Sequence, residues 1–158
     1  MDRAAFCCGE PELDAFFRDH ALDHHVGHKA RVTVGLYDGE LVGFYWLIAQ
    51  SFPLNKVSAE AEQQFAHLGA TPCVYLGMLG TQQGRQGNGI GKTLMLHAMR
   101  QTLSIAERLG VYALTLEAIN ERRARQYEQW GFAYCVEGAL DMYIALPTMR
   151  KAGLTPLA

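Results

Sequence analysis

The residues best suited to chemistry form one glycine-rich run, Gln86-Gly87-Asn88-Gly89-Ile90-Gly91-Lys92, between an apolar stretch and a long helical pattern. Because glycine has no Cβ, consecutive backbone N–H groups in such a turn can point into one concavity. A helix that begins near Ile90 adds its unsatisfied first-turn donors and the positive end of its dipole. The run therefore predicts an anion site for a phosphate. The alternative is a helix entered through a flexible turn that binds nothing.

The spacing of this run distinguishes it from other phosphate loops. It lacks the four residues that separate the first glycine from Gly-Lys-Ser/Thr in a Walker loop, and its third glycine comes too early for a Rossmann turn. It reads Gln-x-x-Gly-x-Gly, and in this it resembles the GNAT superfamily of N-acetyltransferases. The resemblance extends to near the C-terminus, and it implies that acetyl-CoA is the co-substrate. It assigns the pyrophosphate to Gln86, Gly87, Asn88, Gly89, Ile90, Gly91 and Lys92, although an exposed lysine at position 92 would be ordinary.

A second match follows the same pattern. Asn120 precedes Tyr127 by seven residues, and Gly131-Phe132 follows four residues later, which is the spacing common in GNAT enzymes. The resemblance places Asn120 in the cofactor-binding set. Two positions depart from the family pattern, which usually has alanine at Arg123 and an apolar residue at Gln126.

Acetyl transfer from a thioester to an amine needs positioning, polarisation of the carbonyl and an acid for the leaving thiolate. No covalent enzyme intermediate is required, so the absence of a Ser/His/Asp set is expected. Tyr127 is our candidate acid, because a phenol is a suitable donor and because it stands at the family's tyrosine position. The alternative is a tyrosine that packs a helix against the sheet. Glu117 is a weak candidate base, since most such carboxylates are surface groups.

The stretch from Pro72 to Thr81 reads as the strand that leads into the glycine-rich turn. Gly77 and Gly80 weaken it as a strand and suggest a bulge or the close approach of another group. The resemblance implies that Leu79 and Thr81 bind the pantetheine arm through their main chain, but their side chains could also be core.

The N-terminal stretch contains Phe6, Cys8-Gly9, Leu13-Asp14 and Phe16, which resembles one GNAT branch, the toxins of toxin–antitoxin pairs that acetylate aminoacyl-tRNA. The residues themselves predict a helix from about Pro11 to His25 with one apolar face. That face comprises Leu13, Phe16, Phe17, Ala21 and Leu22. His20, His24 and His28 share a four-residue spacing, but they offer too few ligands for a metal site, and we expect no metal.

The remaining patterns predict an α/β fold, an α+β mixed sheet flanked by helices as in GNAT-like acyltransferases. We expect a hairpin of 31–37 and 40–50 around Asp38-Gly39, and a short helix at 58–68. A helix at 90–109 should bury Ile90, Leu94, Ala98, Ile105 and Leu109 and be capped by Gly110. A strand at 111–118, a helix from 120 to Gly131, and a closing hairpin of 135–136 and 141–146 around Gly138 follow. Residues 1–148 should form a single domain, and residues 149–158 a loose C-terminal tail.

Composition limits the class of protein. The chain has 158 residues, of which 49% are apolar, and no long uninterrupted apolar run, so we expect a soluble globule without a membrane span. No secretory signal is recognisable, which predicts a cytoplasmic protein. The four cysteines, Cys7, Cys8, Cys73 and Cys135, lack paired spacing and are expected to be free thiols. The formal net charge of −2 means that any nucleic acid contact must come from a local patch.

These observations favour an acetyl-CoA-dependent N-acetyltransferase, and the most specific form of this hypothesis is a toxin that acetylates aminoacyl-tRNA. Arg122, Arg123 and Arg125 beside Tyr127 could contact phosphates, although solvated helix arginines are an equal possibility. The alternatives are an acetyltransferase for a small-molecule or protein amine, and a noncatalytic acyl-CoA-binding module. An antitoxin protein and a homodimer partner are further expectations of the toxin hypothesis.

Overall fold

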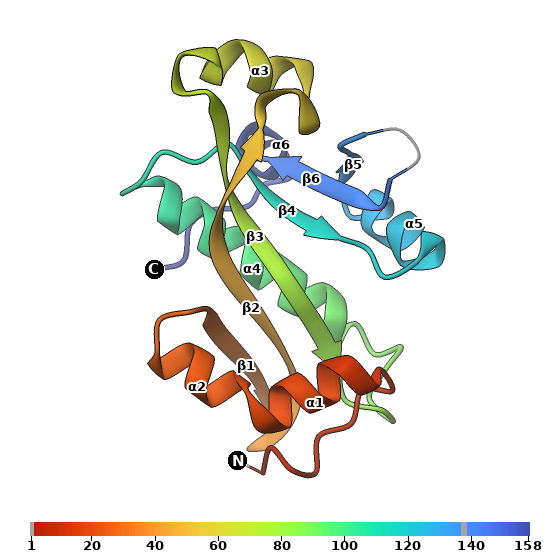
Figure 1. The fold of residues 1–158 in the computed structure, drawn as a ribbon. Helices are drawn as coiled ribbons and strands as arrows, with labels where there is room; N and C mark the ends of the chain where they lie inside the picture. The colour runs from red at the N-terminus through yellow and green to blue at the C-terminus, as the bar shows by residue number, and fades with distance from the viewer. Residues whose placement is uncertain (1, 137–138) are drawn as a thin grey trace. The chain divides into compact units, whose positions relative to one another are not determined.

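The computed structural model describes residues 2–136 and 139–158, and its strands form one six-stranded sheet in the order β1-β2-β3-β4-β6-β5. The pairs β1–β2, β4–β6 and β5–β6 are antiparallel. The strands and helices (Figure 1) make up the predicted α/β fold with a mixed sheet, which is thereby confirmed. The strands are β1 (Arg31–Tyr37), β2 (Glu40–Pro53), β3 (Ala70–Thr81), β4 (Ala113–Glu117), β5 (Ala133–Tyr134) and β6 (Asp141–Ala145).

The chain divides into two compact units, which we describe separately. Unit 1 comprises Met1–Ile48 and Leu76–Ala98, and unit 2 comprises Ala49–Tyr75 and Met99–Ala158. The helices are α1 (Pro11–Asp19), α2 (Ala21–Val26), α3 (Ala59–Phe65), α4 (Ile90–Ala106), α5 (Glu121–Gln129) and α6 (Leu146–Lys151), with 3-10 turns at Leu54–Lys56 and Ala66–Leu68. No helix in the described part of the chain is long and apolar enough to span a membrane.

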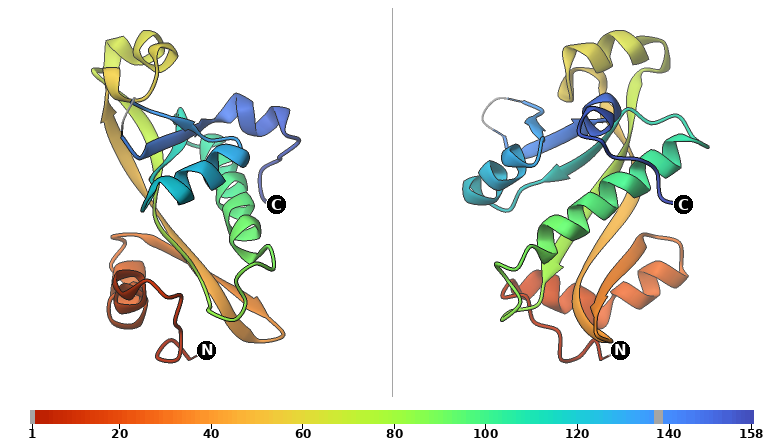
Figure 2. Two further views of the ribbon diagram at one scale, coloured as in Figure 1. Left: turned by 90° about the vertical axis from the view of Figure 1, so that its right-hand side faces the viewer. Right: turned by 180° about the vertical axis from the view of Figure 1, so that it is seen from behind.

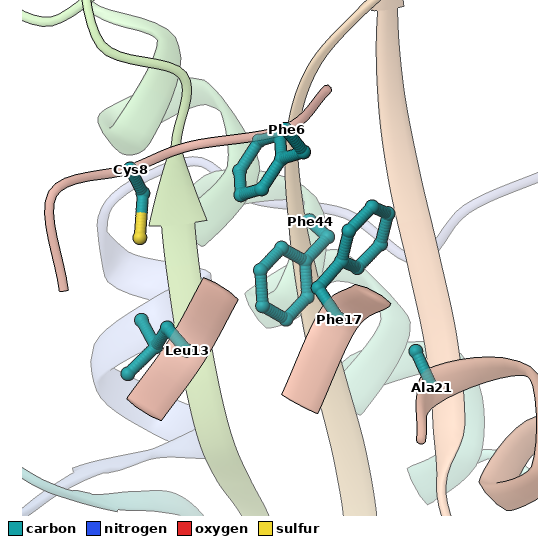
Figure 3. Close-up of a cluster of buried hydrophobic side chains, with 6 residues drawn as sticks. All are labelled: Phe6, Cys8, Leu13, Phe17, Ala21 and Phe44. Carbon is teal, nitrogen blue, oxygen red and sulfur yellow. The ribbon is translucent and has the colours of Figure 1, made fainter. Parts of the chain in front are cut away.

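In unit 1, α1 and α2 cover one face of the strands and the first part of α4 covers the other (Figure 2). The core beneath α1 is aromatic: the Phe17 ring stacks on Phe44 at 4.5 Å between centroids, and Phe6 lies 4.9 Å from Phe17. The cluster is completed by Cys8, Leu13 and Ala21 (Figure 3). The N-terminal segment, α1 and β2 therefore share one hydrophobic core.

The predicted helix from Pro11 to His25 is two helices, because His20 leaves helical geometry with φ −125° and ψ −23°. Hydrogen bonds continue across the break, from His20 N–H to the Phe16 carbonyl and from His24 N–H to the His20 carbonyl. The buried positions are Leu13, Phe17 and Ala21, whereas Leu22 is 52% exposed, contrary to our expectation. The second helix ends at Val26, one residue after the expected end at His25, and Gly27 is its C-cap.

The predicted β-hairpin is also confirmed, with Tyr37 opposite Glu40 in the register. Asp38 and Gly39 both have positive φ, at 50° and 79°, as a two-residue primed turn requires. The short helix predicted at 58–68 is present as α3 and the 3-10 turn after it, and Ser58 Oγ caps α3 by accepting from Ala61 N–H at 3.1 Å.

Helix α4 ends at Ala106, earlier than predicted, so Gly110 does not cap it and Leu109 is 58% exposed. Its buried positions are Leu94, Met95, Ala98, Met99, Thr102 and Leu103. Of the residues predicted to form the buried face of this helix, only Leu94 and Ala98 are fully buried.

The C-terminal residues are ordered, so the prediction of a loose tail is wrong. Arg100 Nε donates to the Thr155 carbonyl at 3.0 Å, and Leu157 N–H donates to Ser104 Oγ at 2.8 Å. The closing hairpin is formed by β5 and β6, with β5 two residues earlier than expected. Gly138 lies outside the described residues.

In unit 1 the Trp46 ring fills the space into which a side chain at position 77 would point. A Cβ built on Gly77 would collide with the Trp46 ring, whereas a Cβ on Gly110 would meet nothing within 4 Å. We predict that Gly77→Ala lowers the free energy of unfolding by roughly 1–3 kcal/mol, the usual cost of overpacking, because the ring or the strand must move. Gly110→Ala should change it by less than about 0.5 kcal/mol. Urea unfolding of both variants tests this, and equal stability would contradict the contact.

Candidate active site

The glycine-rich turn lies in unit 1, at the start of α4. Gly87 and Gly89 have φ of 83° and 79°, values that favour glycine. Among the described residues, none accepts a hydrogen bond from the backbone N–H groups of residues 87 to 92. Such a run of open donors at a helix N-terminus suits an anion. The local structure therefore agrees with the predicted phosphate cradle.

Gln86 anchors the turn. Its Nε2 donates to the Cys8 carbonyl at 2.7 Å and to the Thr81 carbonyl at 3.1 Å. The amide nitrogen is thus used within the protein, so a role for Gln86 in binding a phosphate would fall to its main chain. At the other end of the turn, Thr93 N–H donates to the Gly89 carbonyl at 3.0 Å and begins the helical ladder.

Residues of β3 predicted to hold the pantetheine arm lie beside the turn. A Cβ on Gly91 would be 3.5 Å from Thr81 Oγ1 and 4.0 Å from Leu79 Cδ2. Ile90 packs toward Gly43, whereas Asn88 and Lys92 are exposed. The structure therefore brings the turn, Leu79 and Thr81 together in one place.

The side-chain alternation of β3 breaks near Gly77. A Cβ on Gly77 would meet Trp46, and one on Gly80 would meet Phe44 and Cys8, all on the face covered by α1. Strict alternation would place positions three residues apart on opposite faces. Met78 also packs against this cluster, so residues 77, 78 and 80 all face the core beneath α1.

Tyr127, the candidate acid, lies on α5 in unit 2 and is half-buried. Its ring centroid is 5.7 Å from Trp130 and 5.9 Å from Phe132. Burial raises the pKa of Tyr127, and the nearby Arg123 guanidinium opposes this in part. No hydrogen bond found among the described residues involves the Tyr127 hydroxyl. The phenol is therefore protonated near neutral pH and has a hydroxyl that can donate to a substrate.

The other predicted residues of unit 2 have structural partners. Asn120 caps α5, its Oδ1 accepting from Arg123 N–H at 2.9 Å. Arg123 and Gln126, the two residues that differ from the family pattern, are hydrogen-bonded to each other. Arg123 Nη1 donates to Gln126 Oε1 at 3.0 Å. Glu117 is exposed at the end of β4, opposite Asp141 in the register, and no contact assigns it a catalytic role. The roles of Asn120, Tyr127 and the turn residues stay predictions.

The described residues contain no group of three or more His, Cys, Asp or Glu side chains arranged to hold a metal ion. The prediction of free thiols is confirmed for all four cysteines. Burial raises the pKa of the Cys8 and Cys73 thiols to about 12, which makes them poor nucleophiles. Sequence reasoning placed Phe16 on the apolar face of its helix but missed its contact with the half-buried Trp46 ring, for which Gly77 makes room.

Comparison with known proteins finds relatives over almost the whole chain. A probable toxin TacT of Sinorhizobium fredii is 27% identical over 95% of this chain and 88% of its own length. A tRNA-acetylating toxin of Mycobacterium tuberculosis is 26% identical over 94% of this chain and 89% of its own.

Solved structures show the same likeness. AtaT complexed with acetyl-methionyl-tRNAfMet has a TM-score of 0.86 at 26% identity, with 96% of this chain and 92% of that chain covered. A tyrosine-to-phenylalanine mutant of AtaT bound to acetyl-CoA and the C-terminus of the antitoxin AtaR has a TM-score of 0.80 at 26% identity, covering 96% and 90%. The sequence model of the acetyltransferase (GNAT) family matches residues 2–132, and the chain belongs to this family.

Proposed function

We propose that this protein is a toxin that transfers the acetyl group of acetyl-CoA to the amino group of an aminoacyl-tRNA. The observation that carries the proposal is the likeness, over 96% of the chain, to AtaT complexed with acetyl-methionyl-tRNAfMet. The family membership supplies the reaction class. The relatives from Sinorhizobium fredii and Mycobacterium tuberculosis support the toxin role and tRNA as the acceptor.

The reaction is a direct transfer. The neutral acceptor amine attacks the thioester carbonyl carbon, a C–N bond forms, the C–S bond breaks, and the amine loses a proton to solvent or to a base. Residues 87–92 would bind the pyrophosphate through their open N–H groups, and Leu79 and Thr81 the pantetheine arm. Tyr127 would donate its proton to the departing thiolate, a role that its raised pKa supports.

The partners follow from the same proposal. An antitoxin would inhibit the protein, as the AtaT structure with AtaR suggests for this chain as well. We place the protein in the cytoplasm, where aminoacyl-tRNA is found. The homodimer stays a prediction. Transfer to a small-molecule or protein amine is the alternative, which the formal net charge of −2 would suit better.

The turn is tested by two matched glycine changes. Gly89 and Gly84 have φ of 79° and 83°, and a Cβ on either would meet nothing within 4 Å, but only Gly89 lies in the predicted cradle. Gly89→Val should weaken acetyl-CoA binding about tenfold or more, because left-handed strain costs on the order of 1–3 kcal/mol and 1.4 kcal/mol is tenfold. Gly84→Val should leave affinity within about twofold. Calorimetric titration measures both, and unchanged affinity in Gly89→Val would rule out the cradle.

Tyr127→Phe should lower the rate of acetyl transfer about 10²-fold or more while acetyl-CoA binding stays nearly intact, because one positioned acid is lost and little volume changes. Because burial raises the pKa of the Tyr127 phenol, the phenol stays protonated through neutral pH. The rate of acetyl transfer should therefore fall only when the pH rises into the alkaline range and approaches that pKa. Single-turnover rates measure the effect, with Tyr134→Phe on β5 as the control. Equal turnover in Tyr127→Phe would mean that water protonates the thiolate.

A tRNA acceptor also predicts salt dependence. Arg122, Arg123 and Arg125 are exposed on α5, and Arg125 forms a long ion pair of 3.9 Å with Glu121. Changing all three to glutamine should weaken tRNA acetylation several-fold or more and reduce the salt slope by about one unit for each lost phosphate contact. Acetyl-CoA affinity should not change, and Arg108→Gln should have little effect.

The measurement is kcat/KM for aminoacyl-tRNA over a series of salt concentrations. Acetylation of a small amine instead, without salt dependence, would favour the alternative function. Indifference of tRNA acetylation to these arginines would remove α5 from the tRNA surface.

A further inference from the structure

Unit 2 contains a pocket with a volume of about 440 Å³, lined by residues at the start of α3, before β4 and around the end of β6. Helix α3 is held beside it by Ala61, which is fully buried, and by Phe65, whose ring centroid lies 5.9 Å from that of Tyr112. The Tyr112 ring also lies 6.3 Å from the Tyr143 ring. Two tyrosine side chains therefore line a pocket that the proposed steps of acetyl transfer do not use.

The polar side chains of this pocket carry only oxygen atoms. They are Ser58, Glu60, Tyr112, Tyr143 and Thr148, and the other lining residues are alanine, glycine and isoleucine. Among the described residues, no lysine, arginine or histidine lines the pocket. The pocket therefore offers a ligand hydroxyl groups and one carboxylate, and it has no cation that could pair with an anion.

Hydrogen bonds fix the hydroxyl groups near Glu60. Ser58 Oγ accepts from Ala61 N–H at 3.1 Å and lies 2.9 Å from Tyr112 Oη. Burial raises the pKa of Tyr143, as do the neighbouring Tyr112 and Glu60, whereas a hydrogen bond with Ser58 opposes this shift. The Tyr143 phenol is therefore neutral near pH 7, and the Glu60 carboxylate is the only charged side chain among the described residues that line the pocket.

Glu60 is exposed in the first turn of α3, and it forms no ion pair or hydrogen bond within the described part of the chain. An acid in the first turn commonly stabilises a helix through its dipole, and this is the competing role of Glu60. Glu62 lies in the same turn and is also exposed, but it does not line the pocket. A comparison of the two glutamates therefore separates a role in the helix from a role in the pocket.

From these contacts we propose that the pocket of unit 2 binds a primary alkylammonium group. The ammonium carries one positive charge and three N–H donors: Glu60 pairs with the charge, the hydroxyl oxygens accept from the donors, and the rings of Tyr112 and Tyr143 face the cation. The inference does not depend on the proposed function, because no residue of the pocket takes part in the proposed acetyl transfer. A free small amine and the lysine side chain of a peptide share this chemistry, and the experiments separate them.

The first experiment titrates the wild-type protein with n-butylamine at pH 7.5 without acetyl-CoA, and it follows the amide resonances by NMR. We expect a dissociation constant on the order of 1 mM, a modest ligand efficiency for five non-hydrogen atoms. n-Butanol and butyrate, which keep the alkyl chain but lack the positive charge, should bind about tenfold more weakly or less. Equal affinity for n-butanol, or no binding of n-butylamine, overturns the inference.

The second experiment places the ammonium in the pocket. Glu60→Gln removes one charge and keeps the size of the side chain, so it should weaken n-butylamine binding about fivefold, the scale of one partly exposed ion pair. Glu62→Gln removes the same charge from the same helix turn and should leave the affinity within about twofold. An equal loss in both variants overturns the inference, because it indicates a general attraction to acidic side chains. An unchanged affinity in Glu60→Gln also overturns it, because the amine then binds elsewhere.

The third experiment identifies the source of the ammonium with a Gly-Lys-Gly peptide that is blocked at both ends. Affinity within about twofold of that of n-butylamine, with the same loss in Glu60→Gln, supports the site and assigns it to lysine side chains. Binding of n-butylamine alone supports the site and assigns it to free amines. A protein that acetylates aminoacyl-tRNA but binds neither probe at this pocket would keep the proposed function and overturn the inference.

Discussion

The hydrogen bonds of the Gln86 side chain are the constraint on which the arrangement of unit 1 depends. One amide nitrogen joins the carbonyl of Cys8, in the N-terminal segment, to the carbonyl of Thr81, at the end of β3. The turn that follows is thereby fixed at the point where α4 begins. Because the amide satisfies these two carbonyls, the backbone N–H groups after Gln86 can stay open. Backbone N–H groups without an acceptor cost free energy when they are buried. At an exposed helix start the same groups can bind an anion.

The contact between Trp46 and Gly77 adds a second constraint. The indole occupies the space that a side chain at position 77 would need, so any larger residue there would force the ring or the strand to move. The same contact sets the indole beside the irregular part of the strand, where Gly77 and Met78 share a face. The ring that packs the sheet therefore lies beside the part of β3 that precedes the glycine-rich turn.

A slightly acidic chain would need a local group of cations to bind a polyanion. The formal net charge of −2 gives no general attraction to nucleic acid. A local cation group needs no such excess, and Arg122, Arg123 and Arg125 are placed on one short helix. Arg123 is bonded to Gln126, its neighbour on the helix, so the two departures from the family pattern form one unit on the exposed face of α5. Phosphate contacts of this kind position a nucleic acid without reading its sequence.

Local signals were reliable wherever the cause of a structure lies within a few residues. Asp38-Gly39 specified its hairpin because both residues accept positive φ, and Ser58 and Asn120 specified helix starts because a side-chain oxygen can cap a donor three residues on. The roles of the glycine-rich turn and Tyr127 were assigned from spacing and from the resemblance to the family, and they stay predictions, whereas the predicted family is confirmed by the sequence model that matches residues 2–132.

Other features were decided only by the tertiary structure, because they depend on residues far apart in the chain. The break at His20, the burial of Met95 and Leu103 in place of Leu109, and the docking of residues 155–157 on α4 are examples. The hydrogen bond from Gln86 to Cys8 joins residues 78 positions apart in the sequence, and Trp46 of β2 contacts Gly77 of β3. The sequence by itself determined the local turns, caps and motif spacings and hence the reaction class. Only the folded chain decided which rings stay half-exposed beside β3, because burial is a property of the packed surfaces and not of the local pattern.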